Sequence, residues 1–336
     1  MSRVASARRM QLFAALVAAC VVAAVIAVVS AAGDGDPAGS GDATHALVAA
    51  RGAHEPRLLF RNLDRARPQE FGQVAVAPLG AGGGARTLLP LRCERVYFAA
   101  GNGLCLARGG GFASSYRARV FGADLRVRGE VPVDGIPSRA RVSPDGRYGS
   151  VTLFVTGHSY ADTGSFSTTT TLIDLRMGRK IARLEDFTTT RDGRTISARD
   201  VNYWGVTFAR DSDRFYATLA SGRKIYLVEG SVRARTMRTI HENVECPSLS
   251  PDGTRIAYKK RVGAGGKRWR LYVLELRTMR ETPLAETRSV DDQAEWLDDT
   301  HVLYGLPESI WTVPADGSGR PVAYAPRADS PAVVRW

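Results

Sequence analysis

The sequence predicts an all-β fold that is built from copies of one short unit, and two near-identical stretches define that unit. Ser-Pro-Asp-Gly occurs at 143–146 and at 250–253, and a strand-like run follows each copy. Pro presets φ at the second turn position, Asp bonds its own backbone, and Gly accepts the positive φ that closes the turn. Eroded copies begin at Phe208 and Trp296. A strand–turn–strand unit that recurs roughly every 40 to 50 residues is typical of a β-propeller or a related array.

Short strands separated by Gly, Pro, Asp and Asn run through residues 56–336 and fit six blades of four antiparallel strands. Inner strands are expected to hold small residues, because strands crowd toward the axis of a propeller. The expected strands are 95–99, 104–108, 116–122 and 126–133 in blade two; 139–142, 148–155, 167–175 and 179–184 in blade three; 205–209, 214–219, 224–229 and 235–240 in blade four; 247–250, 255–260, 270–276 and 281–285 in blade five; and 295–297, 301–305, 310–313 and 321–325 in blade six.

Blade one has only three candidate strands near the amino end, at 57–62, 73–78 and 86–91. We expect the segment 332–336, at the carboxyl end, to be its missing inner strand. Trp336 then takes the position that Trp296 has in blade six. This last strand closes the ring and removes the open edges that a linear array would leave.

The amino end contains one apolar run, from Leu12 to Val29, which follows Arg3, Arg8 and Arg9. The run is about long enough to cross a bilayer as a helix, which takes roughly 20 residues, and its basic flank keeps the amino end in the cytoplasm. We expect a cytoplasmic segment at 1–10, a transmembrane signal anchor at 11–32 and a flexible linker at 33–55 that is rich in Gly, Ala, Asp, Ser and Pro. The propeller at 56–336 is then the extracytoplasmic domain of a single-pass membrane protein. Cleavage near 29–31 would instead release it as a secreted protein.

The formal charge of +12 favours anionic partners such as lipid headgroups or wall polymers. The first 32 residues contain three Arg and no acid, which leaves +9 for the remainder. Arg greatly outnumbers Lys, and a GC-rich coding bias accounts for that excess. The basic residues are scattered apart from 259–261 and 267–270, so we expect no nucleic-acid binding.

Three of the four cysteines lie outside the expected anchor, in an oxidising compartment. Cys93 and Cys105 are the only close pair and could form a disulfide. A strict hairpin centred on 101–102 sets Cys105 opposite Phe98 rather than Cys93, so the pairing stays open. Cys246 is expected to be a buried thiol. No Cys or His spacing matches a zinc site, and no cofactor is expected.

The Ser-Pro-Asp-Gly turns, together with the third-strand patterns Ile-Asp-Leu at 173–175 and Val-Leu-Glu-Leu at 273–276, resemble the TolB-like β-propeller family. The resemblance covers roughly 57–336. It implies a six-bladed, extracytoplasmic, non-enzymatic propeller that binds a protein or peptide. TolB is soluble and has an additional amino-terminal α/β domain, for which this chain has no room. The partners of TolB therefore do not carry over, and we expect an unidentified envelope protein or peptide.

A candidate site follows from the layout of the loops. The Ser-Pro-Asp-Gly turns share one face of the ring, the turn face, while the loops after second strands and the links between blades share the other, the link face. Aromatic side chains mixed with both charge signs on the link face suit peptide recognition. Polar loops are common in any protein, however, and Tyr203 or Trp204 could simply fill the core. The candidate binding residues are His158, Tyr160, Asp200, Asn202, Tyr203, Trp204, Glu245, Lys259, Lys260, Asp291, Asp292 and Gln293.

Enzymatic alternatives have less support. The segment 157–161 is one residue away from a nucleophile elbow, but it lies in a loop between strands and no α/β-hydrolase domain follows. The alternative that remains is a metal-dependent propeller enzyme of the lactonase or lyase type, with its site on the axial loops. Oxygen ligands in it would come from Asp200, Asn202, Glu245, Asp291 and Asp292. No fixed spacing supports that site, so we expect a binding module or scaffold and no enzyme.

Overall fold

The computed structural model describes residues 55–81, 85–109, 116–155, 167–197 and 200–335. The chain separates into two units, 1–40 and 41–336, and only the second contains described residues. The expected anchor, most of the expected linker, and the residues His158, Tyr160 and Trp336 therefore lie outside the described part. In the part of the chain that is described, no helix has the length and apolar character needed to cross a membrane.

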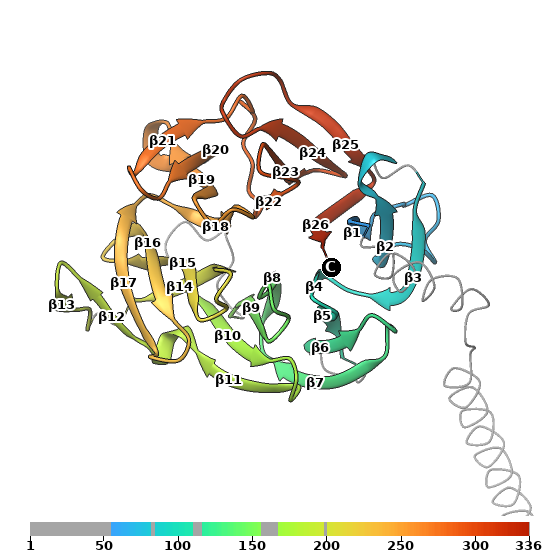
Figure 1. Cartoon of the computed structure of the whole chain (residues 1–336), viewed down its shortest axis with the longest axis horizontal. Coiled ribbons are helices and arrows are strands. Elements are labelled where there is room, and N and C mark those ends of the chain that lie inside the picture. Colours follow the sequence, from blue (N-terminus) through green and yellow to red (C-terminus); the bar gives the residue numbers. More distant parts are fainter. Residues whose placement is uncertain (1–54, 82–84, 110–115, 156–166, 198–199, 336) are drawn as a thin grey trace, which may run out of the picture. The chain divides into compact units, whose positions relative to one another are not determined.

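Six sheets, each with a core of four antiparallel strands, follow one another around a central axis in the described residues, as Figure 1 shows. Blade one contains β26 (Ala328–Val334), β1 (Arg57–Asn62), β2 (Gln73–Pro78) and β3 (Thr87–Arg92), and blade two contains β4 (Arg95–Ala99), β5 (Asn102–Arg108), β6 (Tyr116–Gly122) and β7 (Val127–Val133). Blade three contains β8 (Ile136–Val142), β9 (Tyr148–Phe154), β10 (Thr168–Asp174) and β11 (Arg179–Arg183), and blade four contains β14 (Asn202–Phe208), β15 (Arg214–Ser221), β16 (Lys224–Ser231) and β17 (Thr236–Glu242). Blade five contains β18 (Glu245–Leu249), β19 (Arg255–Val262), β20 (Arg268–Glu275) and β21 (Arg280–Pro283), and blade six contains β22 (Glu295–Trp296), β23 (His301–Leu306), β24 (Ser309–Pro314) and β25 (Val322–Pro326). In the described part of the chain, the connections contain three short 3-10 helices: η1 (Leu79–Ala81), η2 (Leu184–Asp186) and η3 (Ala264–Gly266).

The carboxyl-terminal strand closes the ring, which confirms the expectation from the sequence. β26 is the inner strand of blade one and pairs antiparallel with β1, so that Arg57 faces Val334 and Leu59 faces Ala332. Ala332 and Val334 are fully buried in the core between blades one and two. The first and last strands of the propeller therefore belong to one sheet, next to the marked carboxyl end in Figure 1.

Blade four differs from the expected four strands because a hairpin extends its sheet to six. The hairpin is formed by β12 (Thr188–Arg191) and β13 (Arg194–Thr195), and β12 pairs in parallel with the outer strand β17. Asp192 and Gly193 have φ of 51° and 76°, the positive values that a tight two-residue hairpin turn needs. This hairpin covers the outer edge of blade four, which would otherwise be open to pairing with other chains.

The Ser-Pro-Asp-Gly turns have the geometry that their residues predict. In the turn 143–146, the Asp145 carboxylate accepts hydrogen bonds from the Ser143 hydroxyl (2.6 Å) and from the Arg147 amide (2.9 Å), and Gly146 has φ of 67°. The Ser143 hydroxyl oxygen accepts the Tyr148 amide at 2.9 Å. Each turn therefore satisfies its own polar groups and starts the second strand of the blade.

Cys93 and Cys105 form a disulfide, with 5.4 Å between their Cα atoms. The hairpin register places Cys105 opposite Val96 instead of Phe98, because the two turn residues are Ala100 and Gly101. Cys93 precedes β4 and reaches across the start of blade two. The bond therefore fastens the link between blades one and two. Cys246 is a buried free thiol.

Candidate functional site

A buried ionic cluster fills the centre of the ring. The guanidinium of Arg141, on β8, pairs with the Glu295 carboxylate on β22, and their side chains are only 7% and 5% exposed. Arg141 also donates to the Ala294 carbonyl (3.0 Å) and to the Ser248 hydroxyl (3.3 Å) on β18. Its guanidinium lies 4.6 Å from the centre of the Tyr97 ring. The expectation of small residues on the inner strands is wrong here, since a long charged side chain fills the axis.

The Glu295 carboxylate joins two further strands. It accepts the Tyr97 hydroxyl from β4 at 3.0 Å and the Val333 amide from β26 at 3.2 Å. Burial, and then the charge of Glu295, raises the pKa of Tyr97, so its hydroxyl stays protonated and donates. Burial opposes the charge on Arg141, but Tyr97 and Glu295 outweigh it and raise the pKa of Arg141. Inner strands of five blades are thereby connected through one polar network.

A funnel of about 290 Å³ lies above this network on the turn face. The Tyr97, Arg141 and Glu295 side chains form its floor. Apolar side chains alternate with turn residues along its wall, and Arg210 and Arg335 lie exposed at its mouth. The other lining residues are Ala99, Val142, Pro144, Thr207, Phe208, Ser248, Leu249, Ser250, Pro251, Trp296 and Val333.

Within the described residues, the two arginines at the mouth of the funnel are held by backbone carbonyls rather than by acids. The Arg210 guanidinium donates to the Pro251 carbonyl at 2.8 Å, and Arg335 donates to the carbonyls of Trp296 and Leu297 at 3.3 and 2.6 Å. Both charges consequently remain available to an anionic group of a ligand. A funnel with an apolar wall, a polar floor and a cationic mouth can bind an apolar side chain that carries a nearby negative charge.

On the link face, the structure brings together three of the residues selected from the sequence. Lys259, whose side chain is fully buried, pairs with Asp291, and its ammonium lies 4.8 Å from the centre of the Trp269 ring. The buried Glu245 carboxylate accepts Arg261 at 2.6 Å and the Trp269 indole at 3.0 Å. Burial opposes ionisation of Asp291, but the charge of Lys259 outweighs it and lowers the pKa of this carboxyl. In this ion-pair cluster Lys259 and Glu245 are fully buried, whereas the Asp291 side chain is 39% exposed. The two buried side chains are therefore less free to meet a ligand.

Asp292 and Gln293 lie on the axis instead, together with Arg139 of β8. A cavity of only about 20 Å³ separates them from Arg95 and Ser330. Arg139 is 3.7 Å from the Asp292 carboxylate, and the Gln293 amide donates to the Pro247 carbonyl at 3.0 Å. The axis is therefore nearly closed on the link face and open on the turn face.

The remaining candidates serve local structure. Asp200 accepts the Gly222 amide at 2.7 Å, and the Asn202 side-chain oxygen accepts the Thr168 amide at 3.0 Å. Tyr203 and Trp204 are buried, as the alternative interpretation of the sequence had it. Lys260 is half-buried and pairs with Glu281 of blade five, which also bonds to His241 of blade four. His158 and Tyr160 lie outside the described residues.

The five oxygen-bearing residues considered for a metal do not converge on one point. Glu245 and Asp291 pair with cations, Asp292 faces Arg139, and Asp200 and Asn202 bond to backbone amides. Across the described residues, no three side chains of His, Cys, Asp or Glu are grouped so as to hold a metal ion. The funnel residues, by contrast, were not selected from the sequence, because they come from inner strands far apart in the chain.

The described fold and the funnel define the class: a six-bladed β-propeller with an axial cleft on its turn face. No protein-family model matches the sequence, and no curated protein matches it. Among solved structures, TolB from Acinetobacter baumannii matches with a TM-score of 0.57 at 16% sequence identity, over 83% of this chain and 66% of that chain. A chain of the nidogen/laminin complex matches with a TM-score of 0.54 at 10% identity, over 83% of this chain and 97% of that chain. In fold the chain is therefore a TolB-like propeller, and it spans just under two thirds of the TolB chain that it matches.

Proposed function

We propose that this protein is a membrane-anchored, extracytoplasmic binding module whose axial funnel takes an extended segment of an envelope protein. The observation that carries the proposal is the funnel itself, at about 290 Å³. Sites for whole small molecules usually enclose about 300 to 1,000 Å³, so this one is at the lower limit for a cofactor or metabolite. It suits one or two side chains of a peptide that lies across the mouth.

The chemistry of the funnel supports a peptide that combines apolar and acidic side chains. Phe208, Leu249 and Val333 line the wall and offer apolar contact, while Arg210 and Arg335 at the mouth attract negative charge. Complementary charges on the rim of an apolar pocket and on its ligand chiefly set the orientation and association rate of the ligand. The buried apolar contact supplies the affinity. The fold that the chain shares with TolB is compatible with protein binding, although the partner of this chain is not identified by that likeness.

Anchoring is the second part of the proposal. The apolar run from Leu12 to Val29 and the basic residues before it support a single membrane-spanning segment with the propeller outside the cell membrane. A scaffold tethered in this way meets partners in the envelope at high effective concentration, because a linker of about 23 residues spans on average only about 26 Å.

The test is capture of partners by the full chain after crosslinking in intact cells. Ala99 is half-buried on the funnel wall, so Ala99→Trp fills the funnel with a large ring. Ala66→Trp is the matched control, since Ala66 is exposed on the link face. We expect the captured protein to be lost with Ala99→Trp and kept with Ala66→Trp.

Capture that survives Ala99→Trp unchanged would overturn the funnel as the binding site. If that capture is then lost with Lys260→Glu, binding is assigned to the region around Lys260 and Glu281 instead. Folding of each variant is checked by its thermal transition, because a variant that does not fold is replaced by Ala99→Phe.

A further inference from the structure

Three segments on the turn face of blades two and three lie side by side. They are the β6–β7 connection at 123–129, the turn at 143–147, and the β10–β11 connection at 174–180. A Cβ added to Gly129 would lie 2.9 Å from the Gly178 Cα, so these two backbones touch. The Leu175 amide donates to the Arg147 carbonyl at 2.8 Å, which joins the β10–β11 connection to the turn at 143–147. The three segments therefore form one continuous surface, which we call the basic edge.

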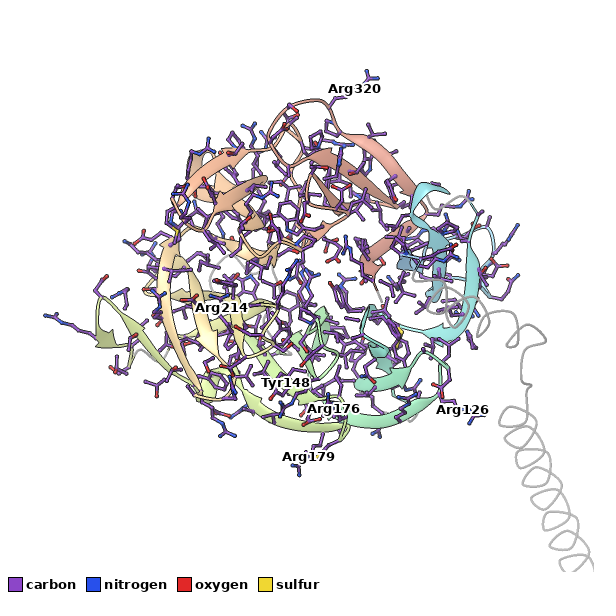
Figure 2. The ribbon with its side chains drawn as sticks, viewed as in Figure 1. Arg126, Tyr148, Arg176, Arg179, Arg214 and Arg320 are labelled. Atoms are coloured by element: carbon purple, nitrogen blue, oxygen red, sulfur yellow. A yellow bond between two sulfur atoms is a disulfide. The ribbon has the colours of Figure 1, made fainter. Side chains whose placement is uncertain are left out.

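The basic edge exposes both positive charge and apolar side chains. Figure 2 shows Arg126, Arg176 and Arg179 along the same side of the ring. Met177 is 60% exposed and Val127 is 43% exposed, which is unusual for large apolar side chains in this protein. Val127 lies directly between Arg126 and Arg128, and Met177 follows Arg176 and is separated from Arg179 only by Gly178. The exposed basic residues of the edge are Arg126, Arg128, Arg147, Arg176, Arg179 and Lys180.

Nearby acids neutralise only part of this charge. Asp124 pairs with Arg128 at 3.3 Å, and within the described residues Arg128 is the one member of the six that forms an ion pair. Asp174 is buried and accepts the amides of Arg176 and Met177 at 2.9 and 3.0 Å, so it shapes the turn from inside. Asp145 is engaged by its own turn, and its charge also interacts with Arg176 without forming an ion pair. With six basic side chains against these acids, the surface that meets solvent has a net positive charge.

The chain enters the propeller on this same face. β1 begins at Arg57, which faces Val334 at the end of β26, and Arg335 lines the funnel together with the turn residues Pro144 and Pro251. Residues 33–55, between the expected anchor and β1, can reach at most about 80 Å and on average about 26 Å. An anchored propeller is thus held near the bilayer by its turn face.

We propose that the basic edge docks on the anionic lipid headgroups of the membrane in which the chain is anchored, with Met177 and Val127 entering the interfacial region. This inference rests on the proposed anchoring but not on the funnel. Basic side chains that flank exposed apolar ones are the combination that binds an anionic bilayer surface. Each Arg or Lys near such a surface strengthens binding about fivefold, and the effect is short-ranged because the Debye length is about 8 Å at physiological salt.

The experiment places the full chain in lipid nanodiscs of neutral phosphatidylcholine, or of phosphatidylcholine with about one third phosphatidylglycerol. Amide hydrogen exchange is then followed in 123–129 and 174–180. We expect exchange there to slow by about tenfold or more in the anionic discs only, and to return to the neutral-disc rate at about 0.5 M NaCl, where the Debye length is about 4 Å.

Two sets of variants make the test specific. The triple variant Arg126→Gln, Arg176→Gln, Arg179→Gln should abolish the protection, since the loss of three charges weakens docking by about a hundredfold. The control Arg65→Gln, Arg223→Gln, Lys267→Gln removes the same charge from exposed link-face positions and should keep the protection. Met177→Asp should also abolish it, and because Met177 is exposed the thermal transition should not move.

Several outcomes would overturn the proposal. Equal exchange in neutral and anionic discs would do so, as would equal loss of protection in the control triple variant. Protection by added soluble polyphosphate but not by phosphatidylglycerol would assign the edge to a soluble polyanion instead. Failure of the anchor has a different signature: the full chain would then not float with neutral vesicles, while salt-sensitive flotation with anionic vesicles would still report the basic edge.

Discussion

Arg141 of blade three and Glu295 of blade six form an ion pair at the centre of the ring, where both side chains are almost completely buried. The two residues are 154 positions apart in the chain. Their remaining hydrogen bonds reach Tyr97, Ser248 and Val333 on three other blades. The pair therefore acts between blades rather than within one.

Loss of one member of this pair should destabilise the whole propeller. We expect Arg141→Met to lower the free energy of unfolding by about 3 to 5 kcal/mol, because Glu295 would be left as a buried charge without its partner. Urea unfolding followed by circular dichroism measures this. Arg65→Met serves as a control. The side chains of the Arg65–Glu308 pair are 75% and 63% exposed, so its loss should leave the free energy of unfolding nearly unchanged. Equal midpoints for the two variants would contradict the role of the axial pair.

Glu185 should make stability depend on pH. Burial raises the pKa of this carboxyl to about 7 from 4.5, although the Thr170 amide bonds one of its oxygens at 3.0 Å. Between these two pH values the folded protein holds a proton that the unfolded chain has released, so stability is full below about pH 4.5 and falls as pH rises to about 7.

The substitution Glu185→Gln removes that loss, because the amide is neutral at every pH and keeps an oxygen for Thr170. We expect the variant to exceed the wild type by about 1 to 3 kcal/mol at pH 8 and to gain nothing near pH 4.5. Urea unfolding at both pH values gives the comparison. A stability difference that is the same at both would show that Glu185 titrates normally.

The disulfide between Cys93 and Cys105 should contribute about 2 to 3 kcal/mol, as expected for a short closed loop. We predict that Cys93→Ala with Cys105→Ala lowers the thermal midpoint by several degrees. A reducing agent should bring the wild type down to the same midpoint and leave the double variant unchanged. If the reducing agent lowers the thermal midpoints of both proteins equally, its effect does not come from the Cys93–Cys105 bond.

Deletion of residues 330–336 should abolish the native ring. It removes most of β26 and with it the pairing to β1 and the buried side chains of Ala332 and Val334. The first blade would then have an open inner edge, and native domains have only about 5 to 15 kcal/mol to lose. Size-exclusion chromatography should show aggregated or unfolded protein. A truncated chain that melts within a degree or two of the full one would be incompatible with the closed ring.

The blades were predictable because each is specified locally. In the turn 143–146, Ser143, Asp145 and Gly146 bond to one another and determine where the next strand begins, so strand positions agree to within a few residues. Ring closure was predictable because one blade had three strands and the chain had one strand left over. The β12–β13 hairpin has no copy in other blades, and repetition therefore could not indicate it; its Asp-Gly turn at 192–193 was the available signal.

The funnel was not predictable, because its floor is assembled by the closed ring. Tyr97, Arg141 and Glu295 are ordinary strand residues in the sequence, and only the radial arrangement of blades brings them together. The opposite holds for Glu245 and Asp291. Their sequence context indicated loop residues free to bind a ligand, whereas Arg261 and Lys259 engage them in ion pairs, in which Glu245 is fully buried and Asp291 remains exposed. Whether the link face also binds a partner stays a prediction.

The pairing of β1 with β26 also determines when this protein can finish folding. β1 is among the first strands to be synthesised, and its inner neighbour β26 is the last. At about 5 to 20 residues per second, the ribosome needs on the order of tens of seconds to make the chain between them. Throughout that interval the inner edge of β1 has no partner in its own chain, and an unpaired strand edge readily pairs with other molecules. Until β26 is made, the edge of β1 must therefore be protected from other molecules, either by fast synthesis of the chain or by a chaperone bound to the early blades.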